Sequence, residues 1–76
     1  MTALEEQMMV ENAMIVMSGD MFQKIYDKLG EWTATADEIR YMAREFVSEL
    51  KWKGKEDERD WIEELQRFED REFEKL

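Results

Sequence analysis

The ten residues at positions 8–17 constrain the fold of this chain more than any other segment. They read MMVENAMIVM, and eight of the ten side chains are apolar. Spaced at 100° per residue on a helix, these side chains surround the whole axis, and a helix that is apolar on every side must be covered on every side. A chain of 76 residues hides only about 60% of the surface its unfolded form exposes. We therefore expect a second polypeptide to cover part of this stretch.

The rest of the sequence favours helix almost everywhere, because it is rich in Glu, Lys, Arg, Met and Leu and has no proline and only three glycines. It predicts an all-α fold, a small three-helix bundle that forms one domain over residues 1–76. The first block covers residues 3–29, with a possible break at residues 18–20, where Asp20 and Gln23 have the spacing of a capping box. Gly30 is placed to end this block.

The second block opens at Thr35, whose hydroxyl is expected to cap the helix while Glu38 reaches back to it, and it ends near Lys53 with Gly54 as the stop. The third block covers residues 55–76. The second and third blocks are expected to form an antiparallel hairpin against residues 21–29. A competing interpretation makes residues 13–17 a short buried strand, although the sequence has no second β-rich run to pair with it.

Apolar spacing predicts which faces of these blocks form the core. The apolar residues of the second and third blocks each fall within an arc of about 140°. The members of these two predicted stripes are Ile39, Met42, Ala43, Phe46, Val47, Leu50, Trp61, Ile62, Leu65, Phe68, Phe73 and Leu76.

Composition argues against catalysis. The chain has no Cys and no His, its three glycines are isolated from one another, and neither serine has a candidate activating base. The carboxylate pairs of the last block are what a helix with ten acids produces by chance, and no calcium-loop spacing is present. We expect a protein that is not an enzyme and that holds no cofactor and no metal.

The net charge of −9 argues against direct binding of nucleic acid, which depends on clustered Lys and Arg. An alternative is that the acidic last block, with Glu63, Glu64 and Asp70 on its surface, mimics nucleic acid and occupies a DNA- or RNA-binding protein. Residues 55–76 carry ten acids and five bases over about 33 Å of helix. This is roughly one net charge per 7 Å, against about one per 1.7 Å in duplex DNA. The charge density favours a solvated face over mimicry.

Protein binding is the expected activity. The predicted contact residues are Met8, Met9, Ala13, Val16, Tyr41, Trp52 and Phe73. Tyr41 and Trp52 fall outside the main apolar arc, so they either form an exposed aromatic patch or close the edge of the core. Phe73 either overhangs the end of the bundle, where it needs a partner, or belongs to a terminal turn that frays. The first block then serves as a homodimer seam, as the surface that faces another protein, or as both.

The class of protein suggests a setting for such binding. Small acidic helical proteins without cofactors are frequent among phage and mobile-element accessory proteins that bind and inhibit a host factor, including inhibitors of restriction or CRISPR systems. The acidic start of the sequence and the absence of a long apolar run fit neither a signal peptide nor a membrane span, so a cytoplasmic location without membrane contact is expected.

Overall fold

The structure, a computed structural model, describes residues 2–17, 19–55 and 57–75 and contains four helices and no strand within them. The helices are α1 (Ala3–Val16), α2 (Gly19–Leu29), α3 (Trp32–Lys53) and α4 (Glu58–Lys75). The all-α prediction is confirmed. The expected break in the first block is also present, so four helices stand where three blocks were predicted. Ser18, at that break, lies outside the described residues. The strand interpretation of residues 13–17 is wrong, because Ala13–Val16 is the last turn of α1.

Both predicted glycine stops are confirmed. Gly30 and Gly54 follow α2 and α3 in the left-handed conformation, each with φ of 69°, which only glycine adopts without strain. The Gly54 amide donates to the Leu50 and Lys51 carbonyls and so satisfies the open end of α3. These two stops fix where the chain turns between α2, α3 and α4.

The predicted start of the central helix is wrong by one turn. Helix α3 begins at Trp32, and the Glu31 carboxylate accepts hydrogen bonds from the Thr33 and Ala34 amides at 2.8 and 3.0 Å. These hydrogen bonds lower the pKa of Glu31, with that from Ala34 contributing most. Thr35 is buried inside the helix, and its hydroxyl donates to the Glu31 carbonyl at 2.7 Å. Glu31 reaches the first amides one turn earlier, so no cap is needed at Thr35.

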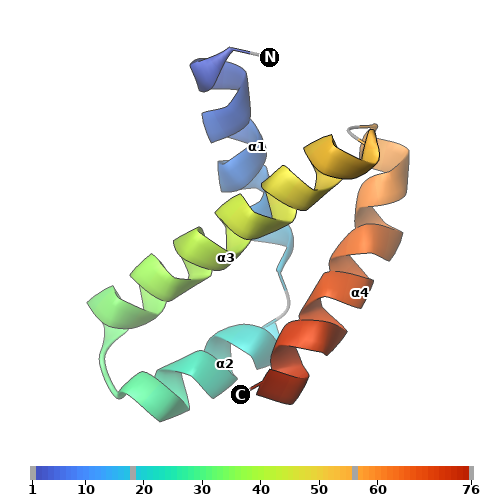
Figure 1. Cartoon of the computed structure of the whole chain (residues 1–76). Coiled ribbons are helices and arrows are strands. Elements are labelled where there is room, and N and C mark those ends of the chain that lie inside the picture. Colours follow the sequence, from blue (N-terminus) through green and yellow to red (C-terminus); the bar gives the residue numbers. More distant parts are fainter. Residues whose placement is uncertain (1, 18, 56, 76) are drawn as a thin grey trace.

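Helix α3 is the central element on which the other three pack (Figure 1). Helix α1 crosses its C-terminal half, α2 folds back along its N-terminal half, and α4 returns beside it in the opposite direction. The expected antiparallel arrangement of α3 and α4 is therefore present. The Cα atoms span only 35 × 24 × 16 Å, and the shortest dimension is less than two helix diameters of about 10 Å each. Helices in such a thin body keep much of their surface in water.

The core draws on all four helices but mostly on α3. All six apolar residues predicted for its inner stripe are buried, and Phe46 lies against Trp61 and Phe68 of α4 with ring centroids 5.9 and 5.6 Å away. Trp61, Leu65 and Phe68 are buried as predicted. Ile62 is not, because it is 81% exposed. Its position at the edge of the α4 stripe turns it away from α3.

Candidate functional site

Helix α1 buries only the side that faces α3. Val10 and Ala13 are buried there, and Met9, Met14 and Met17 pack partly against the same core. The outward side keeps its apolar side chains in solvent. These exposed side chains, with their exposed fractions, are Leu4 (67%), Met8 (58%), Ile15 (78%) and Val16 (55%). The expectation that the chain covers this stretch only in part is confirmed for the described residues.

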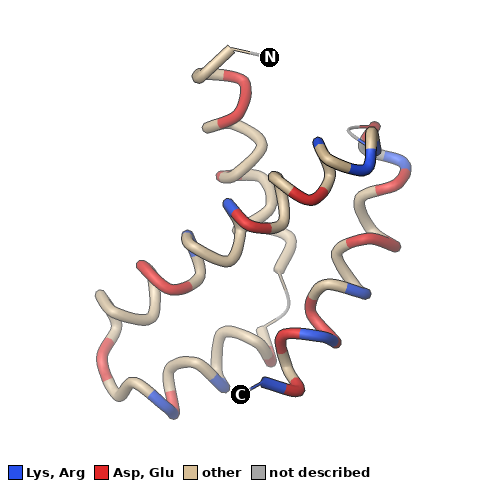
Figure 2. The backbone as a smooth tube through the Cα atoms, viewed as in Figure 1, with Lys and Arg blue, Asp and Glu red and all other residues tan. Residues whose placement is uncertain are grey.

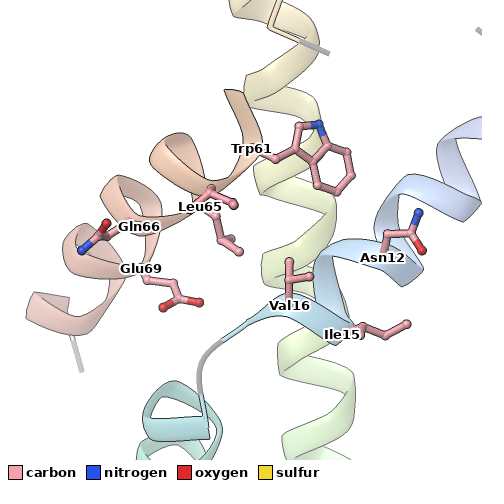
Figure 3. A pocket seen from close by; sticks show the side chains of 8 residues that line it. Asn12, Ile15, Val16, Trp61, Leu65, Gln66 and Glu69 are labelled. Carbon is pink, nitrogen blue, oxygen red and sulfur yellow. The ribbon is translucent and has the colours of Figure 1, made fainter. Parts of the chain in front are cut away.

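A groove of about 560 Å³ separates the C-terminal half of α1 from the middle of α4. Val16 from α1 and Trp61 and Leu65 from α4 turn toward the space between the two helices, while Ile15 lies on the far rim (Figure 3). Most of the lining is apolar. The lining residues are Asn12, Ile15, Val16, Trp61, Ile62, Leu65, Gln66 and Glu69.

The groove has a buried floor and an exposed rim. Trp61 and Leu65 form the floor and are 8% and 7% exposed, because they also belong to the core. Ile15, Val16 and Ile62 are largely exposed apolar side chains at its edges. Neutral amides and one carboxylate complete the rim, and no Lys or Arg is among the lining residues. The arrangement can bury apolar side chains of a partner between two helices.

The predicted contact residues of the first block divide between the two sides of α1. Met8 and Val16 are exposed, and Val16 lines the groove. Met9 is partly buried against the core. Ala13 is fully buried under α3, so its prediction as an accessible contact residue is wrong. The reason is steric: a small side chain is what allows α1 to pack closely on α3 at this point.

The predicted aromatic contacts have different outcomes. Tyr41 and Trp52 are 57% and 91% exposed, so the interpretation that they close the edge of the core is wrong. They lie about three turns apart on α3, outside the groove. A hydrogen bond with Glu45 raises the pKa of Tyr41. Phe73 does not overhang: it is partly buried against the core, and the Lys24 ammonium lies 4.3 Å from the centre of its ring.

The acidic residues singled out on the last block are not equivalent. Asp70 is exposed, and Glu63 is exposed and paired with Arg67 at 2.6 Å. Glu64 is only 5% exposed, so its prediction as acidic surface is wrong. Its carboxylate accepts from Lys55 at 2.8 Å and Lys53 at 3.0 Å, and these hydrogen bonds lower its pKa to about 2. Lys53 and Lys55 thus tie the start of α4 to the end of α3.

Two further features of the described residues bear on function. No group of three or more His, Cys, Asp or Glu side chains in that part of the chain is arranged to hold a metal ion. No helix there has both the length and the apolar character that crossing a membrane requires.

Sequence reasoning missed the α4 side of the groove. The apolar spacing puts Ile62 in the core stripe and makes no prediction for Gln66. The sequence does contain a signal for this surface. Ile62 lies at the edge of the apolar stripe, and Gln66, four positions later, is uncharged, whereas the rest of that surface is charged. No family model matches the chain, and no curated protein or solved structure matches it significantly.

Proposed function

We propose that this chain is a protein-binding module that takes a helical segment of a partner protein into the groove between α1 and α4. The single observation that carries the proposal is the exposure of Ile15, Val16 and Ile62 around an apolar floor. A helix laid into such a groove buries apolar side chains at spacings of three and four residues, which is a recurring mode of peptide recognition.

The size of the surface supports the proposal. A stable protein–protein interface buries on the order of 800 Å² per partner. This amounts to about a seventh of the 5382 Å² surface of the chain. The groove with the adjoining outward side of α1, which adds Leu4 and Met8, extends along most of one helix. That length matches a partner helix of several turns.

Homodimer formation is the second candidate, and the outward side of α1 favours it. Leu4, Met8 and Ile15 lie four and seven residues apart, which is the spacing of a helix–helix seam. In this arrangement α1 packs against α1 of a second copy. The seam is interrupted at Glu11, whose carboxylate pairs with Arg40 at 2.8 Å.

Nucleic-acid mimicry has less support than either. Arg67 pairs with Glu63 and Glu64, Arg71 with Glu49, and these contacts neutralise part of the α4 surface. A mimic needs dense unpaired negative charge, and Glu63, Glu64 and Glu72 of α4 are paired with cations of the chain.

The test immobilises the parent chain and two variants, Val16→Glu and Trp52→Glu. It compares the partner proteins that each of the three captures from a cell extract. Val16→Glu places a charge in the groove wall, and Trp52→Glu places the same charge on a more exposed residue outside it. We expect Val16→Glu to lose the captured protein and Trp52→Glu to keep it. Light scattering of the free chain at rising concentration tests self-association in the same proteins. Capture that survives Val16→Glu, together with a monomer at every concentration, would contradict both candidates.

A further inference from the structure

The net charge of the protein is not spread evenly over the four helices. Helix α1 has three acids and no base, and α4 has eight acids and four bases. Helices α2 and α3 each have equal numbers of acids and bases. The two helices that form the walls of the groove therefore hold seven of the nine net negative charges, and Figure 2 shows α1 without any basic residue.

The four cations of α4 are already subtracted in this net charge, and each pairs with a carboxylate of the chain. Two of the three α1 acids, Glu6 and Glu11, pair with Lys51 and Arg40 of α3, so most of the negative charge beside the groove belongs to α4. Arg59 pairs with Asp57 at 2.8 Å, and Arg67 pairs with Glu63 at 2.6 Å. Arg71 and Lys75 pair with other carboxylates in the same way. The groove itself is lined by Glu69 and no cation.

We infer that the occupant of the groove is an amphipathic helix whose apolar side carries flanking Lys or Arg residues; this inference rests on the proposed function. Its apolar side chains would lie on Trp61 and Leu65 between Ile15 and Ile62. Its cations would lie toward the acidic outer surface of α4. A second copy of this chain fits the same groove poorly, since it would set one acidic wall against another at a net charge of −9 per copy.

The direction of the salt effect separates these occupants. Attraction between a basic helix and the acidic walls is screened by salt, so its affinity falls as salt rises, with a screening length of about 10 Å at 0.1 M. Repulsion between two acidic copies is screened by the same salt, so self-association through the groove would grow stronger.

The experiment uses two synthetic helical peptides of 18 residues with an identical Leu/Ala side, one with Lys and one with Glu on the polar side. Binding of each labelled peptide to the full chain is measured by fluorescence anisotropy at 50 and 500 mM NaCl. We expect the Lys peptide to bind at least tenfold more tightly than the Glu peptide at low salt, and this ratio to shrink severalfold at high salt.

Substitutions by the uncharged residue Gln show where the Lys peptide binds and which carboxylates attract it. Ile62→Gln is expected to weaken the Lys peptide at least fivefold, and Trp52→Gln, at the exposed site outside the groove, to leave it unchanged. Glu69→Gln, in the groove lining, is expected to weaken the Lys peptide more than Glu38→Gln, the same charge change on the exposed side of α3.

Equal binding of both peptides, weakened by Ile62→Gln, would overturn the basic partner and leave the protein-binding groove in place. The inference would also be overturned if neither peptide bound, or if Ile62→Gln left the affinity unchanged. The capture experiment with Val16→Glu then tests the proposed function separately. Self-association that strengthens with salt and is lost in Ile62→Gln would assign the groove to a second copy and overturn the inference as well.

Discussion

Helices α1 and α3 are both rich in apolar residues, but the chain uses them differently. In α3 the apolar residues share one stripe, and all six members of that stripe are buried. In α1 they surround the axis, and only Val10 and Ala13 are buried. Helix α1 packs chiefly against α3, so only one of its sides is covered. The comparison teaches that α3 is the scaffold of the molecule, whereas the surplus apolar surface of α1 is available for a partner.

Ile39→Ala tests the scaffold half of this comparison and is expected to have the largest effect. Ile39 is fully buried in α3, and truncating a buried isoleucine costs about 2–5 kcal/mol of unfolding free energy. A domain of 76 residues has a total of about 4–11 kcal/mol. The variant should be partly unfolded in urea titrations that leave the parent folded. A loss below about 1 kcal/mol would show that the site relaxes freely and that α3 is not a tightly packed scaffold.

Ala13→Leu tests one of the contacts that hold α1 to the scaffold. Ala13 is fully buried, so the added carbon atoms have no space, and overpacking of this kind costs about 1–3 kcal/mol. Amide hydrogen exchange should show α1 losing protection before α2, α3 and α4. Ala3→Leu, at an exposed position of the same helix, is the control and should exchange like the parent. Simultaneous loss of protection in all four helices would mean that α1 is an integral part of the scaffold.

The sequence was sufficient for those features that depend on local rules. Gly30 and Gly54 end helices because the left-handed conformation there suits glycine alone, and the α3 stripe follows from a regular apolar spacing. The break before α2 had a local signal as well. Each of these can be inferred from fewer than about five turns of chain without knowledge of the packing.

The remaining features depend on which side of a helix meets its neighbour, and this is a property of the whole molecule. Ala13 and Val16 are both apolar residues of α1, yet one is fully buried and the other lines a groove. Ile62 and Leu65 divide in the same way on α4. Nothing in the sequence distinguishes Glu64 from Glu63. The structure does, because the ammonium groups of Lys53 and Lys55 lie 3.0 and 2.8 Å from the Glu64 carboxylate oxygens. The apolar spacing shows on which side of a helix an apolar residue lies, but it does not show whether another part of the molecule covers that side.

Glu64→Gln is expected to act through pH, with a smaller effect than the core variants. Hydrogen bonds from Lys55 and Lys53 lower the pKa of Glu64 from 4.5 to about 2, so the folded state favours the charged form. The stability that this contributes is present above pH 5 and is lost as the pH falls toward 2. The variant should therefore be less stable than the parent at pH 7 and equal to it near pH 2 in urea titrations. Glu63→Gln removes the same charge from its exposed neighbour and should stay within about 0.5 kcal/mol of the parent at pH 7.

Ile15→Ala completes the comparison from the α1 side, with the smallest expected effect on folding. Ile15 is 78% exposed, so its truncation should change the unfolding free energy by no more than about 0.5 kcal/mol, whereas the buried Ile39 of α3 is strongly sensitive to the same change. Binding of the Lys peptide should nevertheless weaken severalfold, because Ile15 forms a rim of the groove. Measuring the stability of Ile15→Ala at two protein concentrations sharpens the result. A loss above about 1.5 kcal/mol at both would mean that the chain itself covers α1 in solution. A loss that grows with concentration would mean that a second copy covers it, since association stabilises the folded state by mass action.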